Sequence, residues 1–156
     1  MFVTLLKSIL HNLGVVVVGL GWAFLGSRVD RILGVAPFIA RGAIAAGWLV
    51  LVAGFLLRVW ATAHFYRHQM RVISLEPQET LITTGPYRYT RNPLYLGGNV
   101  FIFFGASLLL GSPTALIATA LHLPLVDAFI RREERQLDRE FGDEWRSYKH
   151  RVRRWL

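Results

Sequence analysis

The stretch that decides the fold lies between Leu81 and Asn99 and reads LITTGPYRYTRNPLYLGGN. It separates two strongly apolar regions and is dense in rings, guanidinium groups, prolines and glycines. Pro86 and Pro93 each fix φ, and each disfavours the helical conformation of the residue before it. The segment therefore cannot form one continuous helix. We predict a shaped loop that presents its polar side chains at fixed angles before the next apolar helix.

Six polar side chains of this loop are candidates for ligand contacts. They are Tyr87, Arg88, Tyr89, Arg91, Asn92 and Tyr95. Two glycines, Gly97 and Gly98, follow them and let another group approach the backbone closely. Two alternatives stay open, because tyrosines at a membrane surface also form aromatic belts and arginines there also contact lipid phosphates.

The composition describes a membrane protein with basic ends. The chain has 156 residues, enough for one domain, of which 53% are hydrophobic, and its formal net charge is +8. It contains no cysteine, which excludes disulfides, thiolate nucleophiles and cysteine metal sites. Although the net charge is positive, the sequence contains no recognised nucleic-acid-binding motif, so we expect no nucleic-acid partner. A lipid bilayer is the expected partner for this charge.

Four apolar segments are long enough to cross a bilayer. They cover approximately residues 3–26, 42–66, 94–110 and 114–130. The last two are separated by the turn signal Gly111-Ser112-Pro113, which predicts a tight helical hairpin. Residues 27–41 form a short amphiphilic connection. Residues 131–156 form an amphipathic helical tail interrupted at Phe141-Gly142. The expected fold is thus an all-α polytopic membrane domain covering residues 1–156.

Ionisable residues in and beside the second span have two interpretations each. Arg58 either snorkels to the interface or contacts a cofactor cavity. His64 and His68 have the spacing of a metal pair, but no third ligand stands nearby, so we expect no metal site. His64 and Glu79 are also candidate bases for an acceptor that must lose a proton.

The distribution of basic residues predicts the orientation in the membrane. Lys7, the Arg67–Arg91 region and the tail hold fourteen lysines and arginines, against three in the Ser27–Arg41 connection. Four spans place both termini and the central loop on one side. Because basic loops are retained in the cytoplasm, we expect that side to be cytoplasmic.

Two ordered motifs carry a family resemblance from about Trp60 to the end of the chain. GPYRYTRNPLYLGG at 85–98 is followed about 35 residues later by REERQLDREFGDEWRSYKHRV. Together they resemble the integral-membrane methyltransferases, which include isoprenylcysteine carboxyl methyltransferases and phospholipid N-methyltransferases. The resemblance implies S-adenosylmethionine (SAM) as cofactor. Carried over to this chain, it implicates Arg91, Asn92, Pro93, Tyr95, Gly97, Gly98, Glu133 and Glu134 in binding it.

The residue inventory suits methyl transfer. It holds no Ser-His-Asp arrangement, no zinc ligand set and no Rossmann fingerprint. The methyl group of SAM is already activated by its sulfonium, so the enzyme mainly aligns the reactants. Arginine, carboxylate and aromatic faces can bind the charged cofactor. Tyr87 joins the candidates on this ground, and Arg91, Asn92, Glu134 and His64 are the candidate catalytic residues.

The acceptor and two other functions remain open. Isoprenylcysteine enzymes usually have histidine where this chain has Asn92 and Glu79, and the asparagine resembles the phospholipid branch. The GPYRY opening and the FGDEWRSY ending instead resemble the isoprenylcysteine branch. We expect an amphiphilic or lipidated acceptor, either a prenylated carboxylate or a phospholipid amine. A sterol-type reductase that uses NADPH is one alternative. The second alternative is a membrane scaffold without enzymatic activity, in which Glu133 and Glu134 belong to a solvated helix face.

Overall fold

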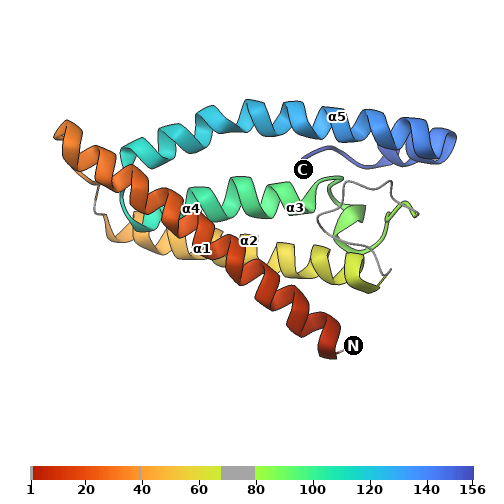
Figure 1. The fold of residues 1–156 in the computed structure, drawn as a ribbon, viewed down its shortest axis with the longest axis horizontal. Coiled ribbons are helices and arrows are strands. Elements are labelled where there is room, and N and C mark those ends of the chain that lie inside the picture. The colour runs from red at the N-terminus through yellow and green to blue at the C-terminus, as the bar shows by residue number, and fades with distance from the viewer. Residues whose placement is uncertain (1, 39, 68–79) are drawn as a thin grey trace.

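The computed structural model describes residues 2–38, 40–67 and 80–156, which form helices and no strand in these ranges (Figure 1). The helices are α1 (Phe2–Leu33), α2 (Arg41–Arg67), α3 (Pro93–Tyr95), α4 (Phe103–Leu109) and α5 (Pro113–Arg151). A π-helix at Leu96–Ile102 joins α3 to α4. In Figure 1, α2, the α3–α4 helix and α5 run side by side, and α1 crosses them obliquely.

The helices have the length and the surface of membrane spans. Three of them, α1, α2 and α5, are long and apolar enough to cross a bilayer, and Pro93–Leu109 is a shorter apolar helix. Large apolar side chains point outward, as in Leu49 at 73% exposure and Leu121 at 71%. Such a surface is stable against lipid rather than water. The predicted all-α polytopic fold with its helical hairpin is confirmed.

The first connection is shorter than predicted. Residues 27–33 belong to α1 rather than to an amphiphilic linker, so the predicted start of the connection was wrong. The reason is Asp30, which is buried and accepts hydrogen bonds from Ser112 Oγ and from the Thr114 backbone at 3.0 Å. Extending α1 by two turns thus brings a carboxylate to the N-terminus of α5, where negative charge is stabilising.

The predicted hairpin turn lies between α4 and α5. Gly111 has a φ of 59°, and a Cβ there would stand 2.5 Å from the Phe38 carbonyl oxygen. Ser112 caps α5 by accepting a hydrogen bond from the Ala115 backbone at 3.1 Å. Both residues explain why the apolar run breaks at this point.

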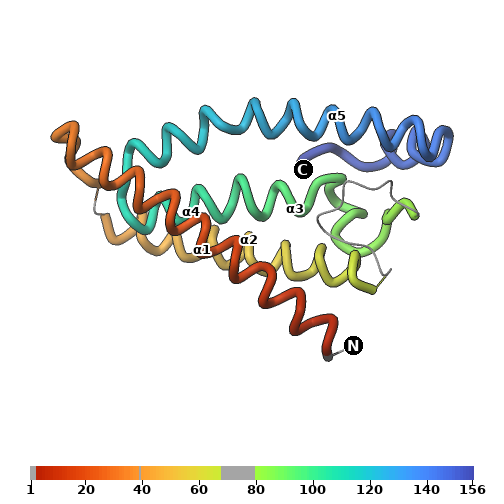
Figure 2. Tube along the Cα trace, in the orientation of Figure 1, coloured from red at the N-terminus to blue at the C-terminus, as the bar shows by residue number. Residues whose placement is uncertain are grey.

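Helix α5 extends the last span directly into the tail. It continues to Arg151 with a kink at Gly142, where φ is 50° and ψ is −118°. The interruption at this glycine is confirmed, but the tail does not stay helical to residue 156. Residues 152–156, which we call the C-terminal segment, leave the helix and turn back beside it (Figure 2).

A buried polar network links α1 to α2 within the apolar region. Arg58 donates from Nε to Asn12 Oδ1 at 2.8 Å and from Nη1 to the Leu94 carbonyl at 2.5 Å. Asn12 in turn donates to Thr62 Oγ1 at 2.8 Å, and Ser8 hydrogen-bonds the same hydroxyl. Arg58 is 9% exposed, so it does not snorkel to the interface.

Candidate functional site

A pocket opens between the central loop and α5. It encloses about 580 Å³ of empty space, the open solvent at its mouth included. Its apolar lining consists of Phe65, Leu81, Ile82, Pro93, Leu94 and Leu137. Its polar lining consists of Tyr87, Arg91, Asn92, Tyr95, Glu133, Glu134, Trp145 and Tyr148.

The loop is held in place by contacts with α2 and α5. A 3-10 turn at Gly85–Arg88 begins with Gly85 at a φ of 61°, and a Cβ there would stand 2.2 Å from His64 Nε2. The imidazole ring of His64 therefore packs directly on the backbone of Gly85. On the other side, Tyr148 OH donates to the Tyr87 carbonyl at 2.8 Å. These contacts fix the backbone of the loop at Tyr87.

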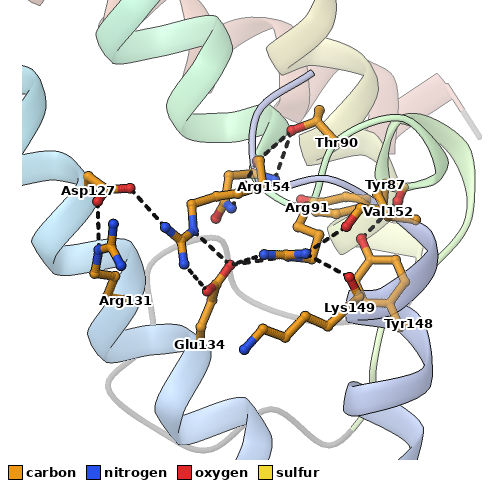
Figure 3. Close-up of polar contacts among 11 residues, drawn as sticks. Tyr87, Thr90, Arg91, Asp127, Arg131, Glu134, Tyr148, Lys149, Val152 and Arg154 are labelled. Carbon is orange, nitrogen blue, oxygen red and sulfur yellow. Dashed lines mark hydrogen bonds and ion pairs between the residues drawn. The ribbon is translucent and has the colours of Figure 1, made fainter.

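Glu134 is the centre of the charged cluster in Figure 3. Its side chain is 7% exposed and pairs with Arg91 at 2.9 Å and with Arg154 at 2.6 Å. Arg154 also reaches Asp127 at 3.2 Å, and Arg131 pairs with Asp127 at 2.7 Å. Burial by itself raises the pKa of Glu134, but the hydrogen bonds from Arg154 and Arg91 outweigh it and lower this pKa below its usual value.

The C-terminal segment lies along the loop. The Arg91 backbone donates to the Arg153 carbonyl at 2.9 Å. The Arg154 carbonyl accepts from Thr90 Oγ1 at 2.9 Å and from Asn92 Nδ2 at 3.2 Å. The three residues before Pro93 are thus held by a segment that lies about sixty positions later in the sequence.

Glu133 differs from Glu134 in its surroundings. It is exposed at the pocket wall, and its Oε1 accepts a hydrogen bond from Tyr95 OH at 2.7 Å. Among the described residues it forms no ion pair. Its carboxylate is therefore the one that faces the pocket without a cationic partner there.

Two buried polar atoms of the pocket have no hydrogen-bond partner among the described residues. They are Tyr87 OH and Trp145 Nε1, in residues that are 7% and 2% exposed. A buried donor without a partner is costly, so such atoms indicate a ligand. Burial raises the pKa of the Tyr87 phenol well above its usual value, which keeps its proton available for donation. The Arg91 guanidinium lies 5.8 Å from the centre of the Trp145 ring.

The structure gathers seven of the predicted site residues in the pocket lining. Five others do not line it, namely Arg88, Tyr89, Gly97, Gly98 and His64. Those that line the pocket are Tyr87, Arg91, Asn92, Pro93, Tyr95, Glu133 and Glu134. Gly97 and Gly98 do not line it, since the group that approaches their backbone is the Arg58 side chain of α2. A Cβ on Gly98 would stand 2.7 Å from Arg58 Nη1.

His64 also lies outside the pocket lining. Its Nδ1 is 3.0 Å from the Trp60 carbonyl, and its ring covers Gly85 as described above. His68 and Glu79 lie outside the described residues. Among the described residues, no group of three or more potential ligands could hold a metal ion.

Three site residues were missed by the sequence analysis. Trp145 and Tyr148 belong to a helical apolar stripe, whose spacing alone gives no sign that their polar atoms face a pocket. Arg154 belongs to a basic cluster at the end of the chain, and no spacing relates it to Glu134. Only the return of the C-terminal segment brings Arg154 and Glu134 together.

Comparison with known proteins identifies the class that this fold and site define, a membrane methyltransferase. The family model for phospholipid methyltransferases matches residues 43–144, well over half of the chain, so the chain belongs to this family. A protein of Haemophilus influenzae, described only as uncharacterized, is 40% identical over 58 residues, which are 36% of this chain and 92% of that protein. No solved structure matches the chain.

Proposed function

We propose that the protein transfers a methyl group from SAM to a lipid-like acceptor at the membrane interface. The observation that carries this proposal is the pocket at the end of the apolar helices. One carboxylate that lacks a cationic partner among the described residues meets two buried donors there that lack a hydrogen-bond partner among them. Membership of the phospholipid methyltransferase family supports the same reaction type.

The side chains of the pocket fit the chemical groups of SAM. Glu133 can accept hydrogen bonds from an amine or from ribose hydroxyls. Trp145 Nε1 and Tyr87 OH can donate to a heteroaromatic ring or a carboxylate. Arg91 already makes four N–H donations to protein oxygens, so its main contribution to the ligand is positive charge.

Bound SAM would supply a methyl group already activated by its sulfonium. The protein then has to orient the reactants and exclude water, and orientation alone can lower a barrier by several kcal/mol. Phe65, Ile82 and Leu137 provide the apolar wall that excludes water. Tyr95 holds the Glu133 carboxylate in position through its hydroxyl. Aromatic faces such as that of Tyr87 stabilise a neighbouring cation.

The acceptor is either a phospholipid amine or a prenylated carboxylate that enters from the bilayer. An amine must lose a proton before or during transfer, whereas a carboxylate need not. Within the described pocket, Glu133 is the carboxylate best placed to take that proton. We therefore replace His64 by Glu133 as the proposed base for an amine acceptor, because His64 lies outside the pocket lining.

Calorimetric titration of the detergent-purified protein with S-adenosylhomocysteine (SAH), beside NADPH, tests the proposal. We expect micromolar binding of SAH that weakens about tenfold in Glu133→Gln, since hydrogen bonds to a charged group contribute about 1.5–3 kcal/mol. Glu144→Gln is the matched control, because Glu144 is exposed on the same helix and does not line the pocket. Binding of NADPH instead would make the protein a reductase. Binding of neither ligand to a folded sample would favour the scaffold.

A further inference from the structure

The two adjacent glutamates of the pocket have unequal numbers of partners. Glu134 Oε1 accepts from Arg91 Nε at 3.1 Å, from Arg91 Nη2 at 2.9 Å and from Arg154 Nε at 3.1 Å. Its Oε2 accepts from Arg154 Nη2 at 2.6 Å. Two carboxylate oxygens offer about four acceptor positions, so Glu134 is almost fully used by the two arginines. Glu133 accepts one hydrogen bond.

The second of these arginines bridges three parts of the protein. The Arg154 guanidinium contacts Glu134 and Asp127, which lie two helical turns apart on α5. Its carbonyl accepts from Thr90 and Asn92 on the central loop. One residue of the C-terminal segment therefore ties the loop to the helix across the pocket.

We propose that Arg154 is a positioning residue, whose forked guanidinium holds Glu134 and, through it, Arg91 in the geometry that the ligand needs. This inference rests on the proposed function and assigns a role to the C-terminal segment. Arg154 does not line the pocket itself, so its effect on a ligand has to pass through Glu134 and the loop.

The geometry explains why Arg91 alone is not sufficient. Arg91 contacts only Oε1 of Glu134, and Arg154 is the described partner of Oε2. Without Arg154 a buried carboxylate oxygen would lack its donor, which is costly enough to move the side chain. Arg91 would then lose two of the four hydrogen bonds that orient its guanidinium over Trp145. The C-terminal segment would also lose its Arg154 attachment to α5, so its carbonyl at position 154 would be held less firmly against Thr90 and Asn92.

Binding and hydrogen exchange together test this role. Arg154→Gln removes the charge and the fork, Arg154→Lys keeps the charge alone, and Arg139→Gln is the matched control at an exposed arginine of α5 outside the pocket lining. We measure the Kd of SAH by calorimetry below the unfolding midpoint of each variant. We also measure amide exchange in the peptide that contains Arg91, whose N–H is bonded to Arg153.

We expect Arg154→Gln to weaken SAH binding about tenfold. Groups that orient the ligands of metal sites contribute about 10- to 100-fold to affinity, and we expect an orienting arginine to contribute at the low end of that range. Exchange at Arg91 should accelerate with and without SAH. Arg154→Lys should fall between this variant and the wild type, and it carries the test if Arg154→Gln does not fold. The inference would be overturned if a folded Arg154→Gln or Arg154→Lys variant bound SAH with wild-type affinity and exchanged the Arg91 amide at the wild-type rate. Failure of the wild type to bind SAH would instead overturn the proposed function.

Discussion

Arg58 shows how a charged side chain can be accommodated among apolar helices. It is buried, and among the described residues its side-chain hydrogen bonds go to neutral oxygens of Asn12 and Leu94 rather than to a carboxylate. A charge in such a place is costly and is tolerated only when its donors are satisfied by protein. The same stem fills the space above Gly97 and Gly98. The arginine therefore joins α1, α2 and the start of the α3–α4 helix.

The ion pairs of Glu134 predict that its contribution to the stability of the fold depends on pH. Its pKa is lowered in the folded protein from the reference value of 4.5 by Arg154 and Arg91, against the opposing effect of burial. A carboxyl group with a depressed folded pKa stabilises the fold fully above its unfolded pKa, and this contribution is lost as the pH falls through the folded value. Glu134→Gln should therefore lower the unfolding temperature at pH 7, and the difference from wild type should shrink below about pH 4.5.

Thermal unfolding in detergent between pH 7 and pH 3 measures this difference. Other carboxylates titrate in both proteins, so the comparison isolates Glu134. Glu144→Gln, at an exposed position, should follow the wild type at every pH. A gap between Glu134→Gln and the wild type that stays constant down to pH 3 would contradict the assignment.

At the scale of elements, α2 and the π-helix pack backbone to backbone. A Cβ on Gly97 would stand 2.7 Å from the Gly54 carbonyl oxygen and 2.7 Å from Arg58 Cγ. Neither the α2 backbone nor the hydrogen-bonded arginine can give way easily. Gly97→Ala should therefore destabilise the protein by about 1–3 kcal/mol, the usual cost of overpacking.

Another helical glycine provides the matched control. A Cβ on Gly21, in α1, meets nothing within 4 Å. Gly21→Ala should be neutral or stabilising by up to about 1 kcal/mol, because alanine is the better helix former. Thermal unfolding of the two variants in the same detergent distinguishes these effects. Equal unfolding temperatures would show that the close contact is not rigid.

At the scale of the whole molecule, the sequence predicts those structural features that depend on local signals. Pro86, Pro93 and Gly111 break the apolar runs at the places where the helices end or begin. The two ordered motifs also predicted seven of the pocket-lining residues on the loop and α5, but not Trp145 and Tyr148. Features set by distant contacts could not be predicted. The end of α1 depends on Ser112 meeting Asp30, and the pairing of Glu134 depends on a chain reversal after Arg151.

The arrangement of the helices allows the orientation in the membrane to be tested directly. The N-terminus of α1 lies at the same end of the molecule as the central loop, whereas residues 34–38 lie at the opposite end (Figure 1). The excess of basic residues at the first end predicts that it faces the cytoplasm. Since the chain contains no cysteine, single introduced thiols can be labelled without background.

We expect Val35→Cys, at an exposed position of the first connection, to react with a membrane-impermeant maleimide on intact cells. Arg139→Cys, exposed on the charged part of α5, should react only after the cells are permeabilised. The reverse pattern would place the pocket on the outer surface, where intracellular SAM could not reach it. Labelling of both sites on intact cells would contradict the separation of the two ends by a bilayer. Orientation and cofactor supply are therefore linked, because a pocket for an intracellular cofactor has to open on the basic side.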